Sequence, residues 1–355
     1  MRVPSADFWT RRRVLLTGHT GFKGGWAALW LERLGAQVSA FSLPPEPGPS
    51  LYALAHVAQG ISDALIDLRD REAVARFVGE ARPQVVLHLA AQPLVRRSIA
   101  QPVETIATNV LGTAHLLDAL RAVDELETIL VVTSDKVYAN TDEGRAFVEA
   151  DRLGGKDPYS GSKAACEFVT RSYSETYFRP RRVVVATARG GNVIGGGDFA
   201  EDRILPDALR ALERGETLVL RHPEATRPWQ HVLDCVGGYL VYVETLAQGG
   251  ESVPRTLNIG PGRDDEAITV RALVETFHAA LGVSHGWRHE PVPGSIEMKA
   301  LQLDTDLARK TLGWADRFSG FRAVEESAAW YQKYLAGADP RQTTLAQIEA
   351  YESVR

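Results

Sequence analysis

The chain has 355 residues, of which 45% are hydrophobic and 24% charged, with a net charge of −5 and an isoelectric point near 6.0. These values are ordinary for a globular protein with a sizeable buried core. The weakly acidic balance argues against a nucleic-acid partner, because no basic field would attract a polyanion. Cys166 and Cys235 have no metal-like spacing, so we expect no metal site, no disulfide framework and a reducing, cytoplasmic setting. No apolar run approaches the roughly 18 to 20 residues of a membrane helix, so we expect no membrane partner.

The first half of the chain alternates short apolar runs with amphipathic stretches. This alternation predicts βαβ units and therefore a parallel sheet. Each predicted strand is rich in apolar residues on both faces, which is typical of strands buried between two layers of helices. The predicted strands are 14–16, 38–41, 64–66, 85–89, 129–133 and 183–188, and the predicted helices are 24–34, 71–81 and 103–121.

Directly after the first predicted strand, glycines recur at intervals of three, at Gly18, Gly21 and Gly24. A turn this tight lets backbone N–H groups and a helix N-terminus meet a pyrophosphate, so it predicts a dinucleotide site. The second strand lacks both an acidic residue for the ribose hydroxyls and an arginine for a 2′-phosphate, so charge does not decide between NAD and NADP. Asp67, after the third strand, is placed either to bind the adenine amino group or to cap a helix that starts at Leu68.

Two groups of ionisable residues lie in the middle of the chain. Tyr159 and Lys163 stand four residues apart, which puts them on one face of a predicted helix. A phenol with a pKa of about 10 is a poor base at neutral pH, but a nearby cation favours its ionised form. Ser134, Asp135 and Lys136 directly follow the strand 129–133, at the edge where open α/β sheets bind ligands. The pattern predicts proton removal from a hydroxyl during hydride transfer to a nicotinamide.

In this order, the glycine turn, the strand-end Ser134 and the Tyr159–Lys163 pair make residues 13–330 resemble the extended short-chain dehydrogenase/reductases. The resemblance implies an α/β fold with a doubly wound, Rossmann-like parallel sheet and a smaller mixed α/β substrate lobe. It implies a dinucleotide-binding domain at 1–190 plus about 232–260, and a nucleotide-sugar lobe at about 191–231 plus 261–355. The implied cofactor is NAD, with NADP not excluded, and the implied cofactor-binding residues are Gly18, Thr20, Gly21, Phe22, Lys23, Gly24, Asp67, Leu68, Leu89, Ala90, Ala91, Asn109, Tyr159 and Lys163.

Asp135 and Lys136 add two ionisable groups that the simple members of that family do not need. With the stretches HTGFKG, GGKDPYSGSK and GNVIGGGD, they resemble the CDP-glucose branch of the sugar-nucleotide 4,6-dehydratases. This resemblance implies that Asp135 is the general acid for the departing C6 hydroxyl and that Lys136 is the base at C5. These roles need a neutral carboxyl and a neutral amine, whereas an adjacent Asp and Lys stabilise each other's charged forms. The alternative is a surface pair without a catalytic role.

By the same resemblance, the partner is CDP-glucose or a related nucleotide sugar, although no residue can be assigned to read the base. Guanidinium groups suit its diphosphate because their fork geometry allows two parallel hydrogen bonds. The implied substrate-binding residues are Gln92, Asn192, Arg203, Arg227 and His231. The helix at 103–121 helps to build a dimer interface in this family, so we expect a homodimer or homotetramer.

Other prominent side chains are expected to be structural. His88 ends the fourth predicted strand, and we interpret it as a core histidine rather than a nicotinamide contact. Trp26 and Trp30 stand at helical spacing and are expected in the core.

Two other functions remain open at this point. An epimerase or reductase on the same scaffold would share the glycines and the Tyr159–Lys163 pair but would not need Asp135 and Lys136. A non-catalytic dinucleotide sensor would use the fold alone, and such a protein would not need the catalytic pair.

Overall fold

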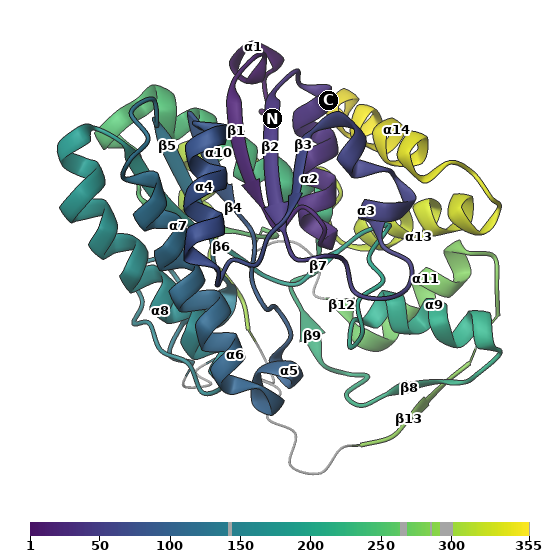
Figure 1. Cartoon of the computed structure of the whole chain (residues 1–355). Coiled ribbons are helices and arrows are strands. Elements are labelled where there is room, and N and C mark those ends of the chain that lie inside the picture. The colour runs from purple at the N-terminus through teal and green to yellow at the C-terminus, as the bar shows by residue number, and fades with distance from the viewer. Residues whose placement is uncertain (141–143, 263–267, 285, 292–300, 355) are drawn as a thin grey trace.

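The computed structural model describes residues 1–140, 144–262, 268–284, 286–291 and 301–354. Within them, a seven-stranded parallel sheet forms the centre of the molecule (Figure 1). Its strand order is β11-β6-β5-β4-β1-β2-β3, so the chain first builds outward from β1 and later restarts on the other side at β4. The strands are β1 Arg13–Thr17, β2 Gln37–Ser42, β3 Ser62–Leu65, β4 Val85–His88, β5 Thr128–Val132, β6 Val184–Gly190 and β11 Thr256–Ile259.

Helices cover both faces of this sheet because successive strand residues point to opposite sides. Leu15 packs in one cluster with α4 and α7, whereas Val14 and Leu16 pack in another with α2 and α10. Figure 1 shows α4, α7 and α8 on one side of the sheet and α2 and α14 on the other. These helices are α2 Phe22–Arg33, α4 Arg71–Ala81, α7 Gly112–Leu120, α8 Pro158–Tyr173, α10 Val232–Gly249 and α14 Pro340–Ser353.

The doubly wound parallel sheet expected from the sequence is confirmed, with differences at its edge. The strand β3 is an edge strand, and Leu65 is 52% exposed, so the expectation of two buried faces is wrong there. The predicted helix 103–121 is α6 Pro102–Ile106, a π-helical turn Ala107–Leu111 and then α7. Asp67 does not cap a helix at Leu68, because α4 begins at Arg71 and Asp70 caps it. Trp26 and Trp30 are fully buried, as predicted.

The later part of the chain adds short strand pairs and helices to one side of the sheet. The pairs are β7 Val193–Ile194 with β10 Gln230–His231, β9 Thr226–Arg227 with β12 Ile268–Thr269, and β8 Leu218–Leu220 with β13 Trp287–His289. The remaining helices are α1 Ala6–Trp9, α3 Leu51–Leu54, α5 Val95–Ala100, α9 Ile204–Arg214, α11 Val270–Ala280, α12 Asp306–Leu312 and α13 Phe321–Leu335. Residues of both predicted lobes share one hydrophobic cluster. The division into two binding regions stays a prediction.

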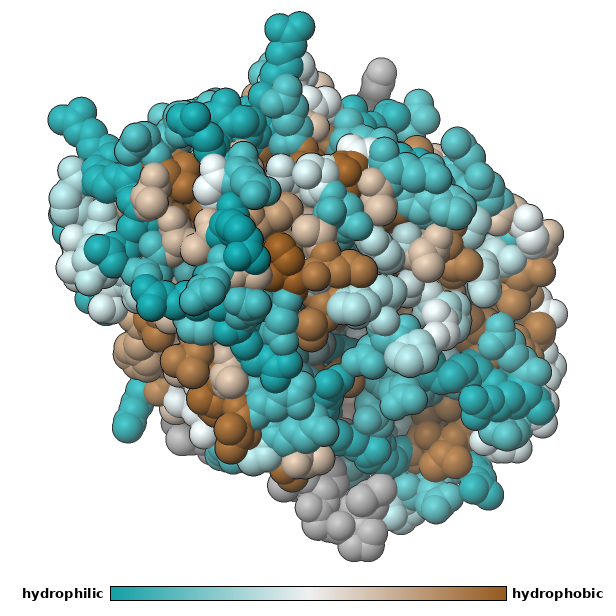
Figure 2. Space-filling model, viewed as in Figure 1, coloured by the Kyte–Doolittle hydropathy of each residue, from teal (hydrophilic) through white to brown (hydrophobic). Residues whose placement is uncertain are grey.

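Hydrophobic side chains remain on the surface of the helices that follow β4 and β5. Val103 of α6 is 81% exposed, Leu111 of the π turn 54% and Phe168 of α8 60%. In Figure 2 hydrophobic residues gather at the lower left, where Figure 1 places α6 and α8. Among the described helices, none is long and apolar enough to cross a membrane.

Candidate active site

The glycine turn between β1 and α2 lies directly against the chain that follows β4. Gly18 has φ +83°, and a Cβ there would come within 2.7 Å of Ala90 N. A Cβ on Gly24 would lie 2.0 Å from the Gly18 carbonyl oxygen. Both positions therefore require glycine, because a side chain at Gly18 would meet the loop after β4 and one at Gly24 would meet the turn itself. The turn sits where the strand order reverses, between β1 and β4, which is where open α/β sheets bind ligands.

The first turn of α2 is built to receive an anion. Gly21 is its N-cap residue and offers no side-chain acceptor to the first amides, which leaves them to an anionic ligand. Thr20 fixes the turn to the end of β2 through 2.9 Å hydrogen bonds to Ser42 Oγ and the Leu43 carbonyl. Lys23 adds a cation on this turn, 5.8 Å from the ring centroid of Tyr239. These residues fit the pyrophosphate of a dinucleotide.

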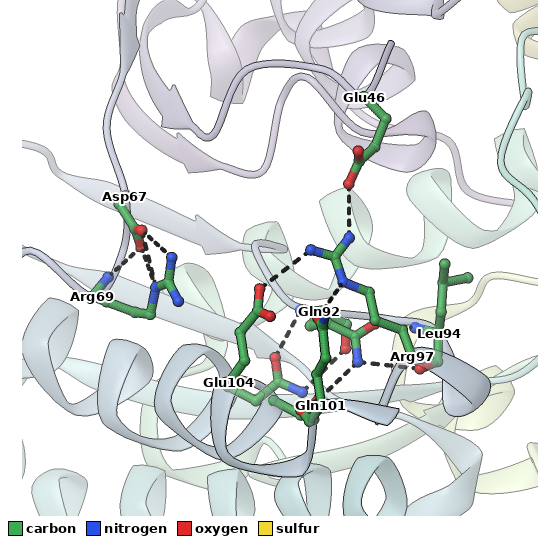
Figure 3. A network of polar contacts seen from close by, with 10 residues as sticks. Glu46, Asp67, Arg69, Gln92, Leu94, Arg97, Gln101 and Glu104 are labelled. Atoms are coloured by element: carbon green, nitrogen blue, oxygen red, sulfur yellow. Dashed lines mark hydrogen bonds and ion pairs between the residues drawn. The ribbon is translucent and has the colours of Figure 1, made fainter. Parts of the chain in front are cut away.

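The predicted adenine contact, Asp67, is engaged with Arg69. Its carboxylate accepts from the Arg69 backbone N–H at 2.8 Å and from the guanidinium at 2.6 to 3.0 Å (Figure 3). These hydrogen bonds hold the pKa of Asp67 below its usual value, although partial burial opposes the shift. The adjacent Leu68 is buried against Gly112, where an added Cβ would lie 2.6 Å from Leu68 Cγ. An adenine amino group at Asp67 would share a carboxylate that Arg69 already orients.

The loop after β4 is held by the π turn. Ala90 N–H donates to Thr17 Oγ1 at 3.1 Å, which leaves Leu89, Ala90 and Ala91 beside the glycine turn. Asn109, in the π turn, accepts from Gln92 N–H at 2.8 Å and donates to the Gln92 carbonyl at 3.2 Å and to Ser162 Oγ at 2.8 Å. The predicted cofactor residue Asn109 therefore shapes this loop and ties it to α8.

Two of the predicted substrate residues have side chains that serve the protein's own structure. The Gln92 amide bonds to Leu94 within its own loop (Figure 3) and donates to Thr105 Oγ1 of α6. The ring of His231 is fully buried, and its Nδ1 accepts from Leu233 N–H at the start of α10. Burial lowers the pKa of His231 to about 3, with a smaller contribution from Arg322. This position does not support the prediction that His231 contacts a substrate, because no surface of the ring is exposed.

His88 is a core residue, as interpreted from the sequence. Its Nδ1 lies 2.7 Å from Thr17 Oγ1 and its Nε2 lies 3.0 Å from Thr113 Oγ1. Burial lowers its pKa to about 3, with a smaller effect from the nearby Lys163. The ring is therefore neutral and satisfied on both nitrogens.

Tyr159 and Lys163 lie on the buried face of α8, beside the end of β5. Lys163 Nζ donates to the Val132 carbonyl at 3.0 Å, and burial lowers the pKa of Lys163. Burial also raises the pKa of Tyr159 to about 12, against the lowering effects of the Ser134 hydroxyl and Arg203. Burial therefore outweighs the neighbouring groups that favour the ionised phenol.

Ser134, Asp135 and Lys136 form a short turn directly after β5. Asp135 is 1% exposed; its Oδ1 accepts from Ser134 Oγ at 3.0 Å and lies 3.7 Å from Lys136 Nζ. Its other oxygen, Oδ2, is buried and has no hydrogen-bond partner within the described part of the chain. A buried carboxylate oxygen in that state needs a proton or a ligand. The alternative of a surface pair is wrong for Asp135, which is buried, while the Lys136 side chain is 26% exposed.

Two further segments lie around the free oxygen of Asp135. A Cβ on Gly191 would lie 3.4 Å from Asp135 Oδ2 and 3.6 Å from Pro228 Cγ. Asn192 follows Gly191 and its carbonyl accepts from Gln230 N–H at 2.9 Å. Pro228 follows Arg227, which is half-buried on β9. The structure thus brings Asn192 and Arg227 to the same end of the sheet as the turn at 134–136.

Arg203 reaches the site from another element. It is the N-cap residue of α9, it is half-buried, and its charge acts on both Tyr159 and the buried Asp198. The guanidinium therefore lies close enough to act electrostatically on the Tyr159 phenol.

Sequence reasoning missed a buried ion pair beside α8 and the turn at 134–136. Glu167 and Arg189 have side chains that are only 6% and 5% exposed and lie 3.0 Å apart. Two features of the sequence pointed to them. Glu167 stands four residues after Lys163 on the same helix, and Arg189 is the only charged residue of β6, a buried strand where an unpaired charge would be costly.

A Rossmann-like sheet, a glycine turn at its switch point and a Tyr159–Lys163 pair beside a strand-end Ser134 define a dinucleotide-dependent enzyme of the short-chain dehydrogenase/reductase class. The family model "NAD dependent epimerase/dehydratase family" matches residues 14–260. The chain belongs to this family. The family is NAD dependent, in agreement with the expected cofactor.

Comparison with individual proteins gives finer likenesses. A CDP-glucose 4,6-dehydratase of Salmonella typhimurium is 37% identical over 352 residues, which is 98% of each chain. A dTDP-glucose 4,6-dehydratase of Xanthomonas campestris is 28% identical over 339 residues, 89% of this chain and 92% of the relative. The UDP-glucose 4-epimerase of Thermotoga maritima, solved with UDP-glucose, aligns with a TM-score of 0.79 over 91% of this chain and 99% of that one. At 22% identity, this last likeness shows the fold alone.

Proposed function

We propose that this chain is a CDP-glucose 4,6-dehydratase that forms CDP-4-keto-6-deoxyglucose. The observation that carries the proposal is the buried Asp135 carboxyl beside Lys136, directly after β5 and next to Tyr159. An epimerase or reductase needs the Tyr159–Lys163 pair but not a second acid and base. The full-length likeness to a CDP-glucose 4,6-dehydratase supports the same reading.

The bound NAD would accept a hydride from C4 of the sugar and return it to C6. Tyr159 takes the proton of the C4 hydroxyl during the first of these steps. Burial raises the pKa of Tyr159 to about 12, and the Lys163 ammonium on the same helix face, together with the positive charge of an oxidised nicotinamide, would lower it again. The glycine turn, Thr20 and Lys23 hold the cofactor diphosphate.

Oxidation at C4 acidifies the C5 proton, and the Asp135–Lys136 pair then removes water. Lys136 takes the C5 proton while Asp135 donates a proton to the departing C6 hydroxyl. Because the two groups lie 3.7 Å apart, moving one proton from the ammonium to the carboxylate would neutralise both without any external acid or base. A small side-chain movement must shorten this distance to that of a hydrogen bond.

The proton balance over a full cycle involves Ser134. After elimination, Lys136 returns a proton to C5 as hydride reaches C6, so the amine is restored. Asp135 has lost its proton to water, however, and Tyr159 has gained the one from C4. Ser134 Oγ hydrogen-bonds to Asp135 and also interacts with the Tyr159 phenol, so it is placed to carry that proton back.

The substrate diphosphate would bind to Arg203 and Arg227, and Asn192 would bind the phosphate or sugar. These three lie on segments that meet near Asp135 and Tyr159. We do not assign His231 or the Gln92 side chain to the substrate, since the protein already uses both. We assign no residue to the cytosine base.

We further propose that the chain is a homodimer or homotetramer that uses the face of α6 and α8. Exposed Val103, Leu111 and Phe168 on this face support the proposal. A cytoplasmic setting is also proposed, and the buried free thiols of Cys166 and Cys235 are compatible with it.

The test is incubation of the purified chain with NAD and, separately, CDP-, UDP-, dTDP- and GDP-hexoses, followed by mass spectrometry for the loss of one water. Loss from CDP-glucose alone would support both the reaction and the base preference. Cofactor binding without water loss from any donor would overturn the dehydratase proposal and favour an epimerase, a reductase or a sensor.

A further inference from the structure

A single buried ion pair contacts both ends of the turn that carries Ser134, Asp135 and Lys136. At the leading end, Thr133 Oγ1 donates to Glu167 Oε1 at 2.6 Å. At the trailing end, Arg189 Nη1 donates to the Tyr138 hydroxyl at 2.8 Å. Glu167 and Arg189 are joined by two parallel hydrogen bonds of 3.0 and 3.1 Å, the rigid arrangement that a guanidinium and a carboxylate favour. The turn is therefore fastened at both ends to one rigid unit.

The same ion pair is fixed to the helix that carries the redox pair. Glu167 follows Lys163 by four residues on α8, so the two side chains lie on one face of the helix. Thr187 of β6 donates to Glu167 Oε2 at 2.8 Å, which adds a contact to the sheet. The spacing between Tyr159–Lys163 and Asp135–Lys136 is thus set through one carboxylate.

Tyr138 extends this unit to the far edge of the sheet. Its hydroxyl donates to Asn258 Oδ1 of β11 at 2.6 Å, and its ring stacks on Phe147 with centroids 4.8 Å apart. Burial raises the pKa of Tyr138 to about 12, so the hydroxyl keeps the proton that it donates. Burial alone would lower the pKa of Arg189, but Glu167 outweighs it and the guanidinium stays charged. Each polar atom of the Tyr138–Arg189 contact is therefore held in one protonation state.

We propose that Tyr138, Arg189 and Glu167 are positioning residues that hold the elimination turn at a fixed distance from the redox pair, so that one sugar reaches both sets of groups. This inference rests on the proposed dehydratase function. None of the three is assigned to touch substrate or cofactor. Loosening either end of the turn should misplace Asp135 and Lys136 while leaving Tyr159 and Lys163 in position, because the contacts of α8 with Thr187 and with the Val132 carbonyl remain.

The test uses the full chain with NAD and CDP-glucose, and compares Tyr138→Phe with the wild type. Two rates are measured: formation of reduced cofactor in a single turnover, and exchange of the C5 proton with deuterated solvent. Tyr138→Phe should slow exchange by about ten- to a hundred-fold, the range for loss of a hydrogen bond to a charged group. The oxidation rate and KM should stay within about two-fold of the wild type. Tyr242→Phe is the matched control, since it also removes a buried hydroxyl, bonded at 2.6 Å to the Pro254 carbonyl, but lies outside this unit.

Each outcome decides one point. Unchanged exchange in Tyr138→Phe, or equal slowing of oxidation and exchange, would overturn the positioning role. Slowing of exchange alone, with Tyr242→Phe near wild type in both rates, would support it. If wild-type protein loses no water from any nucleotide sugar, the proposed function fails by itself, independently of the variants. Should Tyr138→Phe fold poorly, Thr133→Val loosens the other end of the turn and should give the same selective loss of exchange.

Discussion

Ser134, Asp135 and Lys136 follow a strand whose five residues are all buried, whereas Arg203 and Arg227 lie on a helix cap and on a two-residue strand. The turn that carries Ser134, Asp135 and Lys136 is thus held in place by the sheet, by α8 and by the buried Glu167–Arg189 ion pair. The diphosphate-binding candidates are half-buried on short segments of the later chain. This difference suggests that the geometry of the reaction is fixed in the free protein, while the grip on the nucleotide is adjustable. Variants on the two sides should accordingly affect kcat and KM differently.

The largest effect is expected at the phenol. Tyr159→Phe should lower kcat by about 10³- to 10⁴-fold, because the proton of the C4 hydroxyl loses its acceptor, while NAD affinity stays unchanged. Steady-state kinetics and a cofactor titration measure both quantities. Tyr177→Phe, on the surface beyond α8, is the control and should behave as wild type. Comparable turnover in Tyr159→Phe would remove this residue from the mechanism.

Lys136→Met should separate the two half-reactions. Without the amine, exchange of the C5 proton with solvent should fall by about 10²- to 10³-fold, while oxidation at C4 still produces reduced cofactor. Nuclear magnetic resonance in deuterated water follows the exchange and absorbance follows the oxidation. The exposed Lys310→Met serves as the control. Persistent exchange in Lys136→Met would mean that another group is the base.

On the binding side, Arg227→Ala should mainly raise KM for the nucleotide sugar, by about ten- to a hundred-fold, as expected for loss of a charged hydrogen bond. Its kcat should change little, in contrast to the two variants above. Arg271→Ala, which removes a surface ion pair with Glu224, provides the comparison. An unchanged KM in Arg227→Ala would argue against a phosphate contact and would weaken the contrast between the two sides.

The smallest effect concerns stability rather than activity. His231 is buried and neutral, and its pKa is lowered to about 3. Below pH 6.5 the imidazole therefore binds a proton in the unfolded chain but not in the folded chain. The contribution of the neutral His231 to the free energy of unfolding is therefore fully present above that pH and is lost as the pH falls. His231→Asn keeps an acceptor for Leu233 N–H, and between pH 7 and pH 5 it should lose about 2 kcal/mol less unfolding free energy than the wild type.

Urea unfolding at the two pH values measures this difference. The exposed His289→Asn should follow the wild-type pH dependence. If His231→Asn does so as well, His231 is not neutral in the folded chain.

Much of the fold was predictable because the first half of the chain has strong periodicity. The helix expected at 71–81 is α4 at those residues, since Asp70 caps it and Arg82 ends it with φ +40°. The exposure of β3 was not predictable from its sequence, because edge position depends on strand order. The short pairs after residue 190 also escaped prediction, because strands of two or three residues carry no period.

The site shows the same division between local and long-range information. Tyr159 with Lys163 and Ser134 with Asp135 are close in sequence, so their chemistry could be read directly. The burial of His231 could not be read from the sequence, because its environment comes from Trp26 and Phe318, which lie far away along the chain. A sequence position beside a presumed diphosphate segment does not reveal that a side chain turns inward to cap a helix.

The π turn at Ala107–Leu111 has a consequence for how this helix could change in evolution or design. A π turn holds one more residue than the regular helix, and here Asn109 uses that extra room to bind Gln92 and Ser162 at once. Deleting a residue from it would restore an ideal helix but rotate everything on one side by about 100°. The π turn therefore sets the helical register on which the loop after β4 depends. A regular helix in its place would lose that register.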